Sequence, residues 1–105
     1  MQKLLWLGWC LCLSGAWASD DVRAGKARAS TACAVCHGPL GLAMQPHVPN
    51  LAGQSELYLR EQLRHYRSGK RAHEVMSVIA KPLRDTEIDQ LAAWYASLQI
   101  QVEEK

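Results

Sequence analysis

Two cysteines and a histidine stand together in the segment Cys33-Ala34-Val35-Cys36-His37. Two thiols three positions apart can lie along one edge of a porphyrin and add to its two vinyl groups. The histidine that follows would then lie under the iron with its imidazole free to coordinate. The pattern C-x-x-C-H therefore predicts one covalently attached haem c, with Cys33 and Cys36 as attachment points and His37 as an axial ligand.

Other chemistries for these residues fit the rest of the chain less well. A redox dithiol would use the same C-x-x-C but expects alternating strands and helices, and this chain reads as all-helical. A zinc site needs two more ligands at finger-like spacing, and His47, His65 and His73 provide no closely spaced pair. A Cys-His nucleophile is disfavoured because adjacent residues on a helix do not face each other.

The N-terminal 18 residues have the pattern of a secretory signal peptide. Lys3 supplies a positive charge, Leu4 to Leu13 is an apolar run, and Ala16-Trp17-Ala18 has the small-x-small form of a cleavage site. We therefore predict cleavage after Ala18, a periplasmic protein and one mature domain over residues 19–105. Retention as an anchor is the alternative, although the run is short for a span of about 20 residues.

The mature domain would be small for an autonomous core. Removal of 18 of the 105 residues leaves 87, with one tryptophan, three tyrosines and no phenylalanine. Cys10 and Cys12 would leave with the signal segment. A link between the remaining Cys33 and Cys36 closes too short a loop to hold a fold, so a covalent haem would supply the missing apolar surface.

The expected elements are helices, and no convincing strand is present. A helix from Val22 to about Ala32, rich in good helix formers, leads directly into the C-x-x-C-H motif. Prolines and glycines make residues 38–53 an irregular loop. Ser55 can cap a second helix over Glu56–Ser68, which Gly69 would end. A short helix is expected from His73 to Ala80, and a last one from Thr86 to Leu98 with the apolar stripe Ile88, Leu91, Ala92, Tyr95 and Leu98.

Charge is nearly balanced overall but asymmetric in one place. The formal net charge of +2 falls to +1 without Lys3, which argues against a nucleic-acid-binding protein. Five basic residues lie along and just after the second helix, and we interpret them first as a solvated face. The sharper hypothesis is a patch that docks acidic redox partners or neutralises haem propionates. These residues are Arg60, Arg64, Arg67, Lys70 and Arg71.

Taken together, the motifs resemble the class I c-type cytochromes, and more closely the small bacterial cytochrome c553 or c4-type group. The matching segments are CAVCHG, VPNLAGQ, YLREQLRHYRSGKR, the Met76 region and LAAWYASL, in the family's order. The chain departs from the c4 type in having a single haem motif. It also has Arg84 where related sequences often have a serine cap, so Asp85 or Thr86 would have to cap the last helix.

The resemblance implies an all-α class I cytochrome c fold, with three main helices, short helical pieces and loops wrapped around one haem. It implies that the Pro49 carbonyl accepts a hydrogen bond from His37, and that Met76 is the second axial ligand. Met44 and His73 are the rival ligands, and His73 would give bis-histidine ligation. Gly25 would lie at the crossing of the first helix with Trp94 or Tyr95 of the last.

The expected function is that of a periplasmic electron carrier without enzymatic activity. Iron with two protein ligands has no open site and can alternate between ferrous and ferric states. The partners would be redox proteins, an upstream reductase or dehydrogenase and a downstream oxidase or reductase. Three alternatives stay open: a fixed haem subunit of a larger periplasmic dehydrogenase complex, a haem enzyme or gas sensor with a displaceable ligand, and a non-haem dithiol module.

Overall fold

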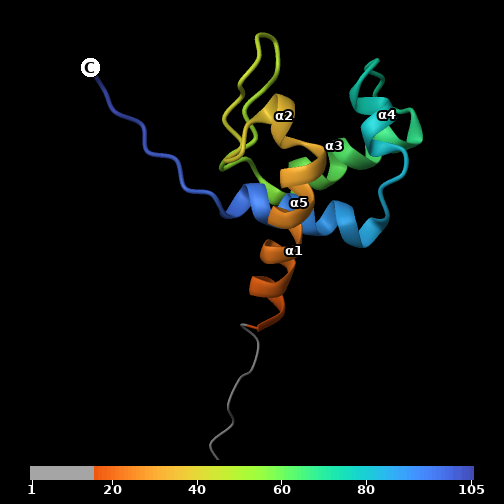
Figure 1. The fold of residues 1–105 in the computed structure, drawn as a ribbon, viewed down its shortest axis with the longest axis horizontal. Coiled ribbons are helices and arrows are strands. Elements are labelled where there is room, and N and C mark those ends of the chain that lie inside the picture. The colour runs from red at the N-terminus through yellow and green to blue at the C-terminus, as the bar shows by residue number, and fades with distance from the viewer. Residues whose placement is uncertain (1–15) are drawn as a thin grey trace, which may run out of the picture.

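The computed structural model describes residues 16–105, which fold into five helices joined by loops (Figure 1). Within that range there is no strand, so the predicted all-α architecture is confirmed. The predicted signal segment lies outside the described residues except for 16–18. The helices are α1 (Ala16–Ala32), α2 (Ala34–His37), α3 (Glu56–Ser68), α4 (Met76–Ala80) and α5 (Asp85–Ser97).

Helix α3 has the bounds that its local sequence predicts. The Ser55 hydroxyl accepts a hydrogen bond from the Tyr58 amide at 3.3 Å, which satisfies one of the free amides of the first turn. Gly69 follows the last turn in the left-handed conformation, with φ of 87°. Both ends of α3 are therefore fixed by the residues directly before and after the helix.

The other helices differ from expectation at their starts. Helix α1 begins at Ala16, six residues before Val22, and passes through the predicted cleavage segment. Helix α4 begins at Met76 instead of His73. Residues 16–105 contain no helix that is both long and apolar enough to cross a bilayer.

The start of α5 corrects the predicted cap. Neither Asp85 nor Thr86 caps the helix; Arg84 occupies the N-cap position with extended backbone. Its amide donates to Glu87 Oε1 at 3.0 Å, which is the reciprocal half of a capping box. Glu87 is only 5% exposed and also pairs with Arg28 of α1. A carboxylate three residues into the helix therefore fixes its start and ties it to α1.

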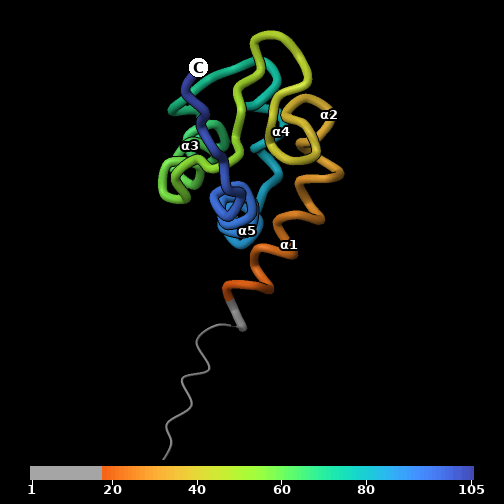
Figure 2. The backbone as a smooth tube through the Cα atoms, turned by 90° about the vertical axis from the view of Figure 1, so that its left-hand side faces the viewer, coloured from red at the N-terminus to blue at the C-terminus, as the bar shows by residue number. Residues whose placement is uncertain are grey.

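The core is built around one face of α5. Ile88 and Leu91 are its largest fully buried side chains, and Trp94 and Tyr95 lie next to them. Figure 2 looks along α5 and shows α1 running past it. Gly25 lies at this crossing, as the resemblance implied: a Cβ there would overlap the Gln90 carbonyl oxygen. The remaining members of the core are Ala29, Leu59, Ala80, Leu83 and Ala92.

The arginines of α3 pair with carboxylates of α5, but Arg64, Lys70 and Arg71 are exposed, so the interpretation of a solvated face holds in part. Arg60 Nε and Arg64 Nη2 lie 3.0 Å and 3.6 Å from Asp89 Oδ1. The Arg60 contact is an ion pair without the angle of a hydrogen bond. Arg67 donates to Asp85 Oδ1 at 2.6 Å and to the Leu83 carbonyl at 3.0 Å. These three arginines thus join α3 to α5 through partly exposed ion pairs.

Candidate haem site

The C-x-x-C-H segment continues directly from α1 and places its three functional side chains within one turn. The Cys33 amide donates to the Ala29 carbonyl at 2.9 Å, and the His37 amide donates to the Cys33 carbonyl at 2.9 Å. Cys33 and Cys36 are half-buried free thiols. His37 is buried, at 7% exposure. Both thiols are therefore available for thioether bonds, and the imidazole is held beside them.

A backbone carbonyl fixes the orientation of His37. His37 Nδ1 lies 2.8 Å from the Pro49 oxygen, the contact that the resemblance implied. A carbonyl oxygen only accepts, so Nδ1 carries the ring proton and Nε2 keeps a free lone pair. A hydrogen bond at one ring nitrogen sets the tautomer and aims the other at a metal. His37 is thus prepared to coordinate through Nε2.

The loop between α2 and α3 is folded back so that Pro49 reaches the histidine. The Leu51 and Ala52 amides both donate to the Gly41 carbonyl, at 2.7 Å and 3.0 Å. Asn50 Oδ1 accepts from the Ala43 amide at 2.7 Å and links the two sides of the loop. Sequence reasoning missed this role, although Asn50 follows Pro49 directly within the quoted VPNLAGQ segment.

Tyr95 is a second residue whose role sequence reasoning missed. Its ring packs against the Gly41 backbone, where an added Cβ would lie 2.9 Å from Tyr95 Cδ1. Its hydroxyl is buried beside Cys33 without a hydrogen bond of ordinary geometry. Burial raises the pKa of the Cys33 thiol, and the Tyr95 hydroxyl partly offsets this. Burial likewise raises the pKa of Tyr95, and the Cys33 thiol adds to that rise.

The two candidate thioether ligands lie on different elements. Met44 lies in the loop after α2, is 70% exposed, and donates its amide to the Cys36 carbonyl at 3.1 Å. Met76 is half-buried at the start of α4. Figures 1 and 2 place α2 and α4 at the same end of the molecule, beyond the crossing of α1 and α5. The fold therefore brings Cys33, Cys36, His37 and Pro49 together and places Met76 on a separate element at that end.

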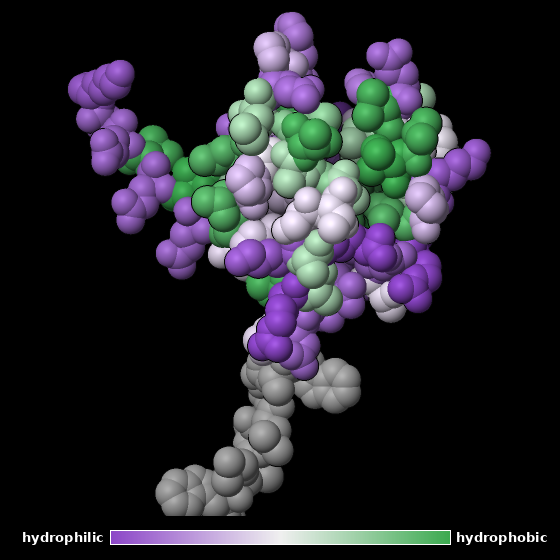
Figure 3. Space-filling model, in the orientation of Figure 1, coloured by the Kyte–Doolittle hydropathy of each residue, from purple (hydrophilic) through white to green (hydrophobic). Residues whose placement is uncertain are grey.

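Apolar side chains are exposed at this same end (Figure 3). Val35 of α2 is 77% exposed and Val78 of α4 is 68% exposed. A cluster of exposed apolar side chains commonly marks a surface that a partner or ligand covers. Leu40 and Leu42 of the loop, and Val75 before α4, are exposed in the same way. A flat apolar cofactor attached at Cys33 and Cys36 would cover part of this surface.

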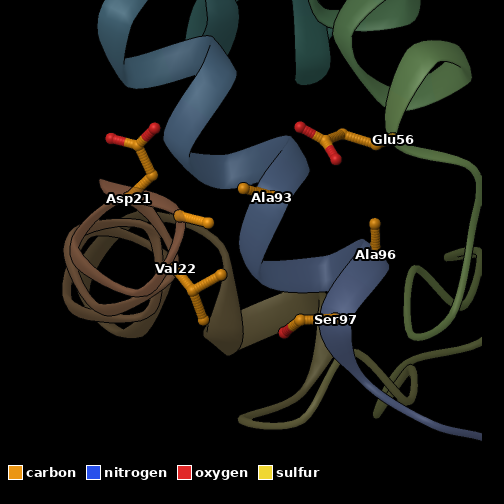
Figure 4. A pocket seen from close by; sticks show the side chains of 7 residues that line it. Asp21, Val22, Glu56, Ala93, Ala96 and Ser97 are labelled. Atoms are coloured by element: carbon orange, nitrogen blue, oxygen red, sulfur yellow. The ribbon is translucent and has the colours of Figure 1, made fainter. Parts of the chain in front are cut away.

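A surface pocket lies away from the C-x-x-C-H segment. It has a volume of about 320 Å³ and is lined by α1, α5 and Glu56 of α3. Figure 4 shows Asp21 and Glu56 on either side of Ala93. Its lining contains no cysteine, histidine or methionine, and Val22 is about 16 Å along the helix axis from Cys33 at roughly 1.5 Å per helical residue. This pocket is therefore separate from the candidate haem site.

Residues 22–99 match the sequence model of the cytochrome c family, and this range includes the histidine and the two thiols. The chain belongs to the cytochrome c family. Haem c, attached covalently, is the cofactor of this family, so the predicted cofactor and the predicted class I cytochrome fold are confirmed. Within the described residues no group of three or more histidine, cysteine or carboxylate side chains offers a separate metal site.

Known cytochromes support the assignment in sequence and in structure. Cytochrome c4 of Thiocapsa roseopersicina is 44% identical over 77 residues, 73% of this chain and 40% of its own length. Cytochrome c-554(548) of Halomonas halodenitrificans is 39% identical over 82 residues, 75% of this chain and 98% of its own. The structure of cytochrome c4 from Acidithiobacillus ferrooxidans superposes with a TM-score of 0.71 at 32% identity, over 74% of this chain and 49% of that one. The chain thus spans less than half of these cytochrome c4 relatives.

The residues present fit a covalent haem. The half-buried thiols are free, and His37 Nε2 is the nitrogen left over by the Pro49 contact. The buried Tyr95 hydroxyl, which lacks an ordinary hydrogen bond, lies beside the Cys33 thiol. This chain's own groups therefore supply two attachment points, one oriented ligand and apolar walls.

Proposed function

We propose that this cytochrome is a single-electron carrier of the periplasm whose haem iron is ligated by His37 and Met76. When bound, haem c supplies a reversible ferrous–ferric couple. The observation that carries the proposal is the 2.8 Å contact between His37 Nδ1 and the Pro49 oxygen. It leaves Nε2 with one orientation, so that ligation needs little rearrangement when the charge of the iron changes.

Two features support Met76 over Met44 as the second ligand. Met76 is half-buried on α4, an element separate from the loop that holds the histidine side of the site. Met44 is mostly exposed, and its backbone is tied to Cys36 on that histidine side. A thioether ligand raises the potential of a c-type haem relative to a second histidine. Two filled axial positions favour electron transfer over enzymatic turnover or gas binding.

The partners would be redox proteins that supply and remove single electrons. Contacts of this class are small and short-lived. The arginines of α3 are paired with Asp85 and Asp89, whereas the exposed Lys70 and Arg71 after the helix take part in no ion pair among the described residues. We therefore expect Lys70 and Arg71, more than the paired arginines, to set the dependence of association rates with redox partners on ionic strength.

The test is a redox and spectral titration of the purified holoprotein with two matched variants. A pyridine haemochrome assay should report one covalent haem. The oxidised protein should show a weak band at about 695 nm, typical of methionine ligation. Met76→Ala should abolish the band and lower the potential, and Met44→Ala should leave both unchanged. Loss of the band in Met44→Ala instead would overturn the ligand assignment, and absence of covalent haem would overturn the function.

A further inference from the structure

The imidazole of His73 is built into the start of the helix that bears Met76. His73 Nδ1 lies 3.2 Å from the Val75 amide nitrogen and 3.3 Å from the Met76 amide nitrogen. The backbone around it is closed by Ser77, whose hydroxyl accepts from the His73 amide at 3.0 Å. The Ser77 amide in turn donates to the His73 carbonyl at 3.0 Å.

Through these contacts the imidazole caps the start of α4, as the side chains of Asn, Asp, Ser or Thr cap most helices. The first amides of a helix have no carbonyl partner within it, and a side-chain acceptor satisfies them. Two amides that point at Nδ1 require a lone pair there, so the ring proton belongs on Nε2. His73 therefore accepts hydrogen bonds from the backbone through Nδ1. The sequence alone leaves His73 as a rival iron ligand.

Helix α4 depends on this bonding more than a longer helix would. It has five residues, Met76–Ala80, which is too short to be stable through its own hydrogen bonds. Packing secures its far end, where Ala80 is fully buried. At the near end Val75 is 48% exposed and Met76 is half-buried. The hydrogen bonds to His73 thus act at an end of the helix that packing covers only in part.

We propose that His73 is the positioning residue for Met76: its imidazole fixes the first turn of α4 and thereby holds the thioether in place for the iron. The inference rests on the proposed ligation by Met76. It assigns to His73 a structural task on the ligand's backbone. Without the imidazole, the first turn would fray and the methionine would be displaced more easily.

The experiment measures how readily added imidazole displaces the methionine from the oxidised holoprotein. The Kd for imidazole should fall about five- to tenfold in His73→Ala, which at 1.4 kcal/mol per tenfold equals roughly the 1 kcal/mol of one lost hydrogen bond. The band at about 695 nm should weaken in parallel. His73→Asn should restore both, because the asparagine Oδ1 can accept from the same amides. His65→Ala, in the last turn of α3, is the matched control and should behave as wild type.

Three results would overturn the proposal. A wild-type Kd in His73→Ala would show that the cap does not hold the ligand. Equal effects of His73→Ala and His73→Asn would show that the imidazole acts other than as a backbone acceptor. Retention of the wild-type spectrum in Met76→Ala would refute the proposed ligation by Met76. Loss of the band in that variant would support the ligation, so that a failed prediction at His73 would then count against the role of His73 alone. Far-ultraviolet circular dichroism of each variant confirms that the fold is intact.

Discussion

Gly25 of α1 lies so close to Trp94 of α5 that a Cβ on the glycine would be 2.9 Å from the Trp94 Cβ. The same Cβ would overlap the Gln90 carbonyl oxygen, which is backbone and cannot swing away. The two helices that frame the site therefore cross at a point where only a hydrogen fits. The position of Cys33 at the end of α1, relative to Tyr95 on α5, depends on this crossing.

Gly25→Ala should lower the free energy of unfolding by about 1–3 kcal/mol, because the methyl group forces α1 and α5 apart. The sign is diagnostic, since glycine to alanine in a free helix stabilises by up to about 1 kcal/mol. Urea unfolding of the holoprotein followed by circular dichroism measures the change. Ala27→Ser, on the exposed side of α1, is the control and should cost no more than about 0.5 kcal/mol. A stabilised Gly25→Ala would contradict the crossing.

Glu87→Gln should destabilise the protein by about 2 kcal/mol. The new side-chain amide could still accept from the Arg84 amide, but the charge that Arg28 requires at this buried position would be gone. The Arg28 side chain is 39% exposed and regains some hydration, so the loss is smaller than for a fully buried pair. Urea unfolding again gives the value. Glu61→Gln, an exposed carboxylate of α3, should change it by less than about 0.5 kcal/mol, and an equal effect at both positions would refute the role of the pair.

The helices that sequence predicted well are those whose ends are fixed locally. Ser55 and Gly69 bound α3 without help from distant residues, so spacing alone located it. The start of α5 was predicted within one residue, at Thr86 instead of Asp85, but its cap was not, because the cap at Arg84 depends on Glu87, and Arg28 from another helix keeps that carboxylate in place. Local propensity favoured Asp85 or Thr86, and tertiary pairing overrode it.

In the haem site, the residues whose side chains do chemistry could be predicted from the sequence, whereas the path of the chain around them could not. Thiols and imidazole in C-x-x-C-H indicated haem attachment from their spacing. The acceptor for His37 is a main-chain oxygen, which every residue possesses, so only a family resemblance singled out Pro49. Spacing likewise placed the arginines of α3 on one face of the helix but could not say that α5 lies opposite. Contacts between distant elements had to come from the structure.

Asn50→Ala should lower the free energy of unfolding by about 0.5–1.5 kcal/mol, because the Ala43 amide loses its acceptor. The loop would also hold the Pro49 carbonyl less firmly against His37 Nδ1, and the reduction potential should shift as a result. Asn50→Asp keeps an acceptor oxygen at the same place and is the matched variant. Urea unfolding and a redox titration of both proteins provide the comparison. If the two variants lost equal stability, the Ala43 contact would not be the cause.

The ion pair between Arg67 and Asp85 should make part of the stability acid-sensitive. The Arg67 guanidinium, 2.6 Å from the carboxylate, holds the pKa of Asp85 below its ordinary value of 3.8. The unfolded chain therefore takes up the proton more readily than the folded one. The stabilisation is present above the unfolded pKa and is lost as the pH falls through the folded pKa.

Asp85→Asn should accordingly differ most from wild type at neutral pH, with the difference constant down to about pH 5 and shrinking below about pH 4. Urea unfolding across this range measures it. The double variant Arg67→Met/Asp85→Asn, compared with Arg67→Met alone, supplies the control, because without the guanidinium the main cause of the depressed pKa is gone. The pH-dependent part should then largely vanish. A difference that grows as the pH falls would reverse the sign and refute the pairing as its source.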